Sequence, residues 1–216
     1  EAEYETAKTL EAKGLYLFDS GATYKDGTTD VTRTISLGEN TYEEKLHYTL
    51  VTIGMLRLLN TTFKRGAIGV CLDIKAREAL WEYGLDYNHG TGHGVGFVNT
   101  VHEMPTSIRN KINKDVYRNL EFEPGMIMSD EPGVYISGKH GIRMEILMTV
   151  VDKGEGFLGF EPLTMAPIDN EPLFVDVMTK KDIELYNNYQ RQVYDSISGG
   201  LNEEEKAWLK EVTKEI

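Results

Sequence analysis

Residues 15–37 read LYLFDSGATYKDGTTDVTRTISL, and this stretch decides the fold. The run Thr28–Leu37 is rich in Thr, Val and Ile, and the dipeptide Asp26-Gly27 comes directly before it. Such a dipeptide between strand-forming segments is typical of a β-hairpin, because Gly accepts the positive φ that a tight turn needs. The sequence therefore predicts one strand from Leu15 to Asp19 and a second strand over Thr28–Leu37.

The two predicted strands carry one carboxylate each, Asp19 and Asp30. If Asp26-Gly27 is a two-residue loop, Thr23 pairs with Asp30, which puts Asp19 and Asp30 on one face. A regular ladder in this register leaves them about 13 Å apart, at ~3.3 Å per residue. We therefore expect a bulge or a bend near Ser20-Gly21 if the two carboxylates act together.

Beyond the hairpin, the chain alternates between helical and strand-like patterns. Thr41 with Glu44, and Thr179 with Asp182, have the spacing of capping boxes at helix starts. Trp208 is expected on the buried side of the last helix. The expected elements are a helix after residue 41, a helix over about 73–83, strands over 126–131 and 141–151, and tail helices over about 179–197 and 202–216.

Residues 88–96 read NHGTGHGVG, and four glycines in nine residues do not make a stable helix. They do allow the backbone to approach other groups closely. His93 lies between two glycines and has no evident packing role, which favours a functional role. His89 and His102 bracket it, and an ordinary surface position remains the alternative for both.

Two further carboxylates occupy strand positions. Glu131 ends a strand just before Pro132-Gly133, and Glu145 follows Arg143 by two residues on the same strand face. A buried, unpaired carboxylate is too costly to keep charged, so either Arg143 pairs with an acid or a metal ion neutralises the group. Imidazole and carboxylate together suit Mn²⁺, Co²⁺, Fe²⁺ or Zn²⁺. A solvated Asp30 and a plain Glu145–Arg143 ion pair remain the alternatives.

The composition limits the class of protein. The chain has 216 residues and a formal charge of −12, which argues against nucleic acid as the main partner, because phosphates need clustered Lys and Arg. Cys71 is the single cysteine, so no internal disulfide can form, and this suits a reducing, cytoplasmic compartment. No apolar run approaches the ~20 residues that span a bilayer, so no membrane association is expected.

Taken together, these motifs resemble those of the Xaa-Pro aminopeptidases of the long, cytosolic type, in the pita-bread metallopeptidase superfamily. The resemblance covers nearly the whole chain, including the tail. The four motifs are the segments 19–34, 89–96, 129–133 and 141–145.

The resemblance implies an α+β pita-bread (creatinase/aminopeptidase) fold, with a curved antiparallel sheet and outer helices. Residues 1–154 would be an N-terminally truncated catalytic domain, and residues 155–216 a mostly helical C-terminal extension. His89 and His102 would contact the substrate, and Arg143 would orient a site carboxylate. Two divalent ions, usually Mn²⁺ in this family, would be held by Asp19, Asp30, His93, Glu131 and Glu145.

The implied activity is a dinuclear metal hydrolase that removes the N-terminal residue from peptides with proline in second position. The resemblance also implies a homodimer and N-terminal domains that this chain lacks. We therefore expect the chain to bind metal but to turn over weakly or not at all by itself. The alternatives are a prolidase or another aminopeptidase of the superfamily, and a metal-free module that binds peptides or acts as a chaperone.

Overall fold

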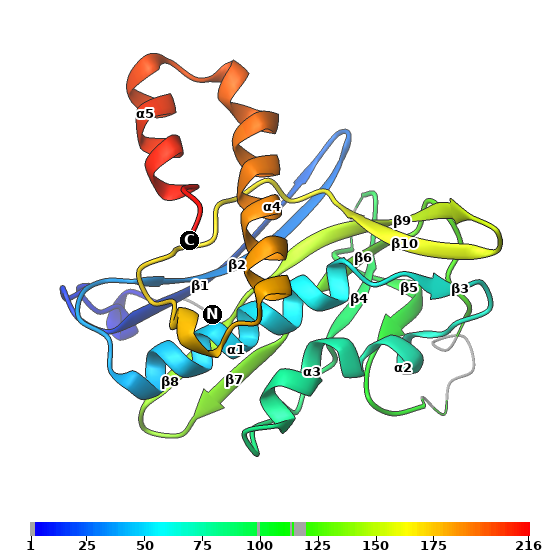
Figure 1. The fold of residues 1–216 in the computed structure, drawn as a ribbon, viewed down its shortest axis with the longest axis horizontal. Coiled ribbons are helices and arrows are strands. Elements are labelled where there is room, and N and C mark those ends of the chain that lie inside the picture. The colour runs from blue at the N-terminus through cyan, green and yellow to red at the C-terminus, as the bar shows by residue number, and fades with distance from the viewer. Residues whose placement is uncertain (1–2, 99, 113, 115–119) are drawn as a thin grey trace.

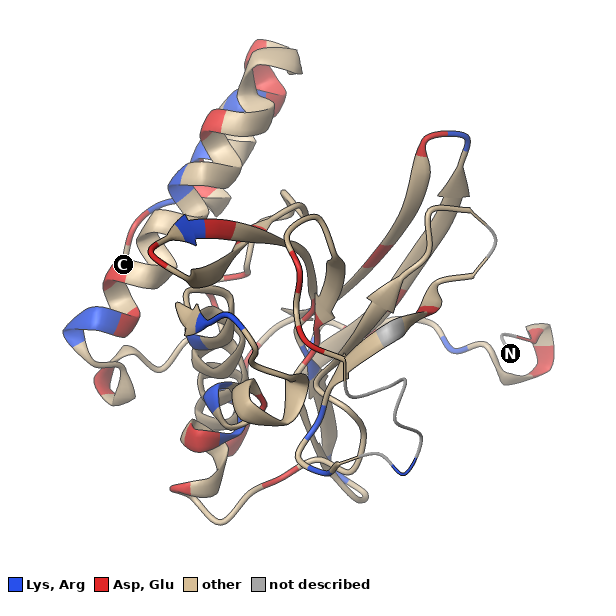
Figure 2. Cartoon of the chain, turned by 90° about the vertical axis from the view of Figure 1, so that its right-hand side faces the viewer, with Lys and Arg blue, Asp and Glu red and all other residues tan. Residues whose placement is uncertain are grey.

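The computed structural model describes residues 3–98, 100–112, 114 and 120–216. Figure 1 shows the arrangement of the helices and strands, and in the turned view of Figure 2 most helices lie on one side and most strands on the other. The helices are α1 Tyr42–Leu59, α2 Gly69–Leu72, α3 Ile74–Trp81, α4 Lys180–Ile197 and α5 Glu203–Val212. Short 3₁₀ turns cover Tyr4–Thr6, Val175–Val177 and Ser198–Gly200. Within the described residues, no helix is long and apolar enough to cross a membrane.

The strands form one six-stranded sheet and two separate hairpins, and their recorded pairings are antiparallel. The sheet has the order β3-β10-β9-β6-β4-β5, and the hairpins are β1-β2 and β7-β8. The bounds are β1 Leu15–Tyr24, β2 Gly27–Ser36, β3 Phe63–Lys64, β4 Gly92–Val95, β5 His102–Ile108, β6 Ile127–Asp130, β7 Gly133–Ile136, β8 His140–Arg143, β9 Ile146–Gly154 and β10 Phe157–Pro162.

The β1-β2 hairpin confirms the predicted shared face but corrects the predicted register. Tyr24 pairs with Gly27, so the loop lies one residue earlier than Asp26-Gly27. Gly27 still supplies a positive φ, of +146°, at the first position of β2. Asp30 therefore pairs with Gly21, two residues from Asp19. The carboxylates are neighbours along a regular ladder, and the bulge predicted near Ser20-Gly21 is absent from this described pairing.

The glycines of residues 88–96 allow β4 to pack tightly between its two neighbours. A Cβ atom on Gly92 would lie 2.0 Å from the Ser129 carbonyl oxygen of β6. A Cβ atom on Gly94 would lie 2.4 Å from the Glu103 carbonyl oxygen of β5. The predicted close backbone approach is confirmed, and its partners are the two adjacent strands.

The predicted strand over 141–151 is interrupted. Residues 140–143 form β8, residues 146–154 form β9, and Glu145 lies between the two strands. The backbone N–H of Met144 donates to the Pro132 carbonyl, and that of Glu145 to the Thr32 carbonyl of β2. The break thus turns Glu145 toward the β1-β2 hairpin.

Helix α1 lies at the centre of the core. The predicted capping box is present, with Thr41 Oγ1 accepting from the Glu44 N–H and Glu44 bonding back to the Thr41 N–H. Most residues from Leu46 to Leu59 are buried, since α3 and α4 both pack against this helix. A helix that is buried nearly all round fits a position inside a layered fold.

The tail begins with β10, which pairs with β9 and β3 and so continues the sheet past residue 154. Helix α4 starts at the predicted cap, where Thr179 Oγ1 accepts from the Asp182 N–H. In α5 the prediction for Trp208 was wrong: its side chain is 60% exposed, whereas Leu209 is fully buried. The division at 154/155 stays a prediction.

Candidate metal centre

The predicted metal ligands meet in one cavity of about 460 Å³. It lies where the β1-β2 hairpin faces β4, β5 and the ends of β6 and β8. The titratable side chains that line it are Asp19, Asp30, His93, His102, Glu131 and Glu145. These residues come from five separate segments of the chain, and only the folded sheet brings them together.

Within this cavity, three groups each have possible ligand atoms within 4.8 Å of one another. The groups are Asp19 with Asp30 and Glu145, His93 with Glu131 and Glu145, and Asp30 with His93 and His102. Glu145 and Asp30 each belong to two groups. The geometry therefore provides two adjacent sites that share carboxylates, as a dinuclear centre requires.

His93 presents one defined nitrogen to the cavity. Its Nδ1 lies 2.9 Å from the Gly94 carbonyl oxygen, which can only accept, so Nδ1 carries the proton. Its Nε2 is left as a free lone pair, 3.5 Å from Asp30 Oδ2 and 3.3 Å from Glu131 Oε1. A neutral imidazole fixed in one tautomer by a backbone carbonyl is the form that binds a metal ion.

Glu131 follows β6 directly and is held from both ends. Its backbone N–H donates to the Thr91 carbonyl at 2.7 Å, and its Oε1 accepts from Ser129 Oγ at 3.2 Å. The same Ser129 hydroxyl accepts from the His93 N–H at 3.0 Å. One serine thus orients both an imidazole and a carboxylate of the candidate site.

Arg143 makes hydrogen bonds at the exposed edge of the site, and its predicted role of orienting a site carboxylate stays a prediction. Its NH2 group donates to Asp19 Oδ2 at 2.6 Å, and its Nε donates to Thr32 Oγ1 at 3.2 Å. Its NH1 group donates to the Tyr135 hydroxyl at 3.1 Å. Arg143 therefore fixes the Asp19 carboxylate, and among the described ion pairs it forms none with Asp30, Glu131 or Glu145.

Among the described residues, no Lys or Arg forms an ion pair with the buried acids Asp30, Glu131 and Glu145, and their pKa values show the cost. Burial, followed by repulsion from Glu131, raises the pKa of Glu145 to about 8. Burial raises the pKa of Glu131 to about 7, and it also raises the pKa of Asp30. The charged form of these clustered carboxylates is therefore unfavourable without cations. Divalent cations would balance the negative charge, and the carboxylate oxygens and the His93 imidazole would be their ligands.

The other two histidines occupy different places. His102 is exposed on the cavity wall, with its ring centroid 4.2 Å from that of His93. His89 lies outside the three ligand groups. Its Nδ1 donates to the Gly90 carbonyl at 2.8 Å, so its Nε2 accepts from the Tyr135 hydroxyl at 2.9 Å.

Sequence reasoning missed three side chains that orient this site: Tyr135, Thr32 and Ser129. Tyr135 connects His89 to Arg143, and Thr32 Oγ1 donates to Glu145 Oε2 at 2.7 Å. Thr32 and Ser129 each lie two residues from a predicted ligand on a strand, so strand alternation could have found them. No such pattern pointed to Tyr135.

Outside this cavity the acidic residues are dispersed over the molecule, and a second cavity is not lined mainly by acids. Acidic residues are spread over helices, strands and loops (Figure 2). A cavity of about 470 Å³ between α1, α3 and α4 is lined by side chains of both signs. Its Arg57 already pairs with Asp182 at 2.8 Å. The acidic and basic side chains that line this second cavity neutralise each other, so it does not resemble the cluster of carboxylates in the first cavity.

The antiparallel sheet, its covering helices and the carboxylate–histidine cluster define a metallopeptidase of the pita-bread fold. The chain belongs to metallopeptidase family M24, which matches residues 2–152. Residues 156–216 match the C-terminal region of the same family.

Several relatives are similar over the whole chain. Aminopeptidase P1 of Arabidopsis thaliana is 39% identical over 99% of this chain, and a probable Xaa-Pro aminopeptidase P of Talaromyces marneffei is 42% identical over 96%. The structure of a cytosolic X-prolyl aminopeptidase from Caenorhabditis elegans, described as having a di-nuclear active site, covers 94% of the chain with a TM-score of 0.86 and 37% identity. The chain spans 34%, 32% and 34% of these three proteins' lengths.

Proposed function

We propose that this chain is the catalytic part of a dinuclear metal hydrolase that removes the N-terminal residue from peptides with proline in second position. One observation carries the proposal: Asp19, Asp30, His93, Glu131 and Glu145 converge as two adjacent ligand groups that share a carboxylate. Four carboxylate charges would be balanced by two divalent cations. We assign Mn²⁺ as the resident metal, with Co²⁺, Fe²⁺ and Zn²⁺ as the alternatives.

The tail favours an Xaa-Pro aminopeptidase over a prolidase. The prolidase of Pyrococcus furiosus covers 69% of this chain with a TM-score of 0.59 and 32% identity. The worm aminopeptidase covers 94% with a TM-score of 0.86, so its likeness extends further along the chain. The tail, residues 156–216, matches the C-terminal region of family M24, and the three relatives reported above that match over 94% or more of the chain are all aminopeptidases by name. This supports the aminopeptidase assignment.

In the proposed reaction, Asp19, Asp30, His93, Glu131 and Glu145 would hold the two ions, which would supply Lewis-acid activation of water and of the scissile carbonyl. The chain's own groups position the reactants. Arg143 holds the Asp19 carboxylate and the Tyr135 hydroxyl, and Tyr135 in turn donates to His89 Nε2. His102 faces the cavity from β5, where its ring can stabilise the oxyanion that develops on the substrate carbonyl.

The wider setting of the protein is also part of the proposal. We assign the protein to the cytoplasm, in agreement with its single cysteine and with the cytosolic worm relative. Its partners would be peptides with a penultimate proline, a second copy of the chain, and the additional domains found in the longer relatives.

The first test measures metal content. After exposure to Mn²⁺ and removal of excess metal, the protein should retain about two ions per chain by elemental analysis, as a dinuclear site requires. Chelation should then lower the melting temperature. Absence of bound metal, with a melting temperature that does not respond to chelation, would instead support a metal-free peptide-binding or chaperone-type module.

A second test separates the peptidases by substrate length. We expect Xaa-Pro-Xaa tripeptides to lose their first residue at a rate comparable with, or above, that of Xaa-Pro dipeptides. A prolidase would cleave the dipeptide and leave the tripeptide intact. The comparison uses the ratio of the two rates, so it holds even where the absolute turnover of the chain is low.

A further inference from the structure

Arg33, on β2, is buried with 4% exposure, yet all of its hydrogen bonds go to uncharged oxygens. Its five N–H groups make five bonds of 2.6 to 3.0 Å, which fully satisfies the guanidinium. The acceptors are the carbonyl oxygens of Thr32, Glu145, Ala166 and Pro167 and the hydroxyl of Tyr189. A buried cation held only by neutral dipoles is costly, so its position calls for a reason.

One of these acceptors belongs to the candidate metal centre. Arg33 NH1 donates to the Glu145 carbonyl at 2.6 Å. The neighbouring Thr32 accepts from the Glu145 N–H at 3.0 Å and donates its hydroxyl to Glu145 Oε2 at 2.7 Å. Glu145 lies in the break between β8 and β9, where it has no regular strand partner. Thr32 and Arg33 therefore fix both its backbone and its carboxylate.

Three further acceptors belong to the C-terminal region. Ala166 and Pro167 lie in the segment after β10, and Tyr189 lies on α4 with 3% exposure. The Tyr189 hydroxyl accepts from Arg33 NH2 at 3.0 Å and lies 3.0 Å from the carbonyl oxygens of both Thr164 and Ala166. One guanidinium thus joins β2, Glu145 and the tail.

We propose that Arg33 is a positioning residue for Glu145, the carboxylate that the two candidate ligand groups share. Arg33 connects Glu145 to Tyr189, so the C-terminal region helps to hold this carboxylate in place. Arg33 itself does not touch the cavity, and its effect passes through the Glu145 backbone. This inference rests on the proposed dinuclear site. In this inference, residues 163–189 stabilise the position of one ligand of that site.

The test titrates the metal-free chain with Co²⁺ and follows the visible absorption spectrum of the bound ions. In Arg33→Lys the ammonium offers at most three of the five donors, so Glu145 loses part of its support. We expect affinity for Co²⁺ to fall about 10- to 100-fold, as for other groups that orient metal ligands, with an altered spectrum. Tyr189→Phe removes a single acceptor, so we expect a smaller loss, of about fivefold.

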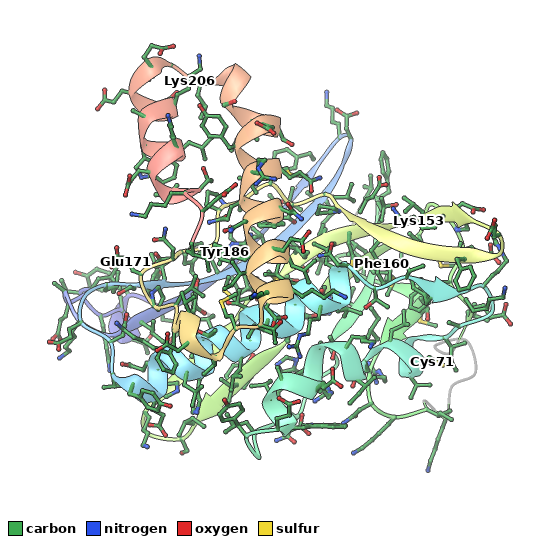
Figure 3. The ribbon with its side chains drawn as sticks, in the orientation of Figure 1. Cys71, Lys153, Phe160, Glu171, Tyr186 and Lys206 are labelled. Carbon is green, nitrogen blue, oxygen red and sulfur yellow. The ribbon has the colours of Figure 1, made fainter. Side chains whose placement is uncertain are left out.

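The matched control is Tyr186→Phe, on the same helix (Tyr186 is labelled in Figure 3). Tyr186 is also buried, but its hydroxyl donates to the Ile168 carbonyl at 3.1 Å and accepts from Gln190. This variant should lose stability much as Tyr189→Phe does, while its Co²⁺ affinity and spectrum stay those of the wild type. A purely structural role for Tyr189 would make the two variants alike in both measurements.

The outcomes separate this inference from the proposed function. If the wild-type chain binds no Co²⁺, the dinuclear site itself is wrong, and the inference falls with it. If the wild type binds two ions and both Arg33→Lys and Tyr189→Phe bind them with unchanged affinity and spectrum, only the positioning role is overturned. If Arg33→Lys does not fold, Tyr189→Phe against Tyr186→Phe decides the question alone.

Discussion

Arg77, on α3, is fully buried, and its guanidinium holds the turn that leads into β4. It donates to Asp73 Oδ2 at 2.6 Å, to the Tyr87 carbonyl at 2.7 Å and to the His89 carbonyl at 2.9 Å. Asp73, equally buried, accepts from the Thr91 hydroxyl at 2.6 Å. The pair therefore fixes the backbone that carries His89 and the Thr91 carbonyl to which Glu131 is bonded.

Removing this guanidinium should destabilise the fold strongly. In Arg77→Met, Asp73 remains buried without its cation, so we expect the free energy of unfolding to fall by about 3–5 kcal/mol in urea denaturation. Arg65→Met is the control, because Arg65 pairs with Glu123 and Asp152 at the exposed surface. It should lose no more than about 1 kcal/mol. Equal losses in the two variants would contradict the prediction.

At the same scale, the sequence motifs were enough to find the candidate ligands but not the groups that hold them. Asp19, Asp30, His93, Glu131 and Glu145 do converge, as the motifs implied. Hydrogen bonds that cross many residues of sequence, such as that from Arg33 to the Glu145 carbonyl, leave no local pattern. Their partners are set by tertiary packing, which periodicity along one strand does not report.

Among the elements, β4 is the strand with the least tolerance for a side chain. A Cβ atom on Gly92 would meet the Ser129 carbonyl oxygen at 2.0 Å, and a backbone carbonyl in a central strand cannot move aside. We expect Gly92→Ala to lower the free energy of unfolding by about 3 kcal/mol or more. Gly199→Ala, which meets nothing within 4 Å, should leave stability unchanged or raise it by up to about 1 kcal/mol. Similar melting curves for both variants would count against this account of β4.

Helix α1 and strand β8 meet at a pair of histidines that should make stability depend on pH. His47 is 5% exposed, and its Nδ1 lies 2.9 Å from His140 Nε2. Burial, and then the neighbouring His140, lowers the pKa of His47; Glu43 opposes this shift, whereas Lys139 adds to it. Because its folded-state pKa is below the unfolded value of about 6.5, the unfolded chain binds more protons as pH falls. Stability contributed by neutral His47 is therefore present at higher pH and lost on acidification.

The measurement compares the wild type with His47→Gln. The free energy of unfolding should fall more steeply in the wild type between about pH 7.5 and about pH 5.5, the window that contains the unfolded pKa of histidine. Both proteins have the same carboxylates, so the contribution of these groups to the pH dependence cancels in the difference between the two free energies of unfolding. A constant difference across this window would show that His47 does not titrate on unfolding.

The hairpin shows why elements are easier to predict than their register. The positions of β1 and β2 follow from composition, but β1 extends five residues past its predicted end at Asp19, and the loop was placed one residue too late. That single step turned neighbouring carboxylates into ones expected to be about 13 Å apart, since each strand residue adds ~3.3 Å. Likewise, the alternating pattern over 141–151 ran through the break at Glu145, because the hydrogen bond from Glu145 to Thr32 is a tertiary contact.

For the molecule as a whole, the candidate metal centre joins parts of the chain that are far apart in sequence, so ion binding should be coupled to global stability. Hydrogen bonds connect the β1-β2 hairpin to the rest of the chain. They join Asp19 to Arg143, Thr32 to Glu145, and Arg33 to the Ala166 carbonyl in the tail. Across the same gap, Asp30 faces His93, whose Nε2 also lies 3.3 Å from Glu131 Oε1. Without cations, the carboxylates on the two sides repel each other and weaken this contact.

We therefore expect Mn²⁺ at about 100 times its dissociation constant to stabilise the chain by about 2.7 kcal/mol for each ion bound, with a matching rise in melting temperature. Asp30→Asn should abolish most of this rise. The same variant should be more stable than the wild type when both are metal-free, because it removes a buried charge that Asp19 repels. Asp176→Asn, at an exposed position, should keep the full response to Mn²⁺. An undiminished rise in Asp30→Asn would place the bound ions elsewhere, since Asp30 belongs to the group with Asp19 and Glu145 and also to the group with His93 and His102.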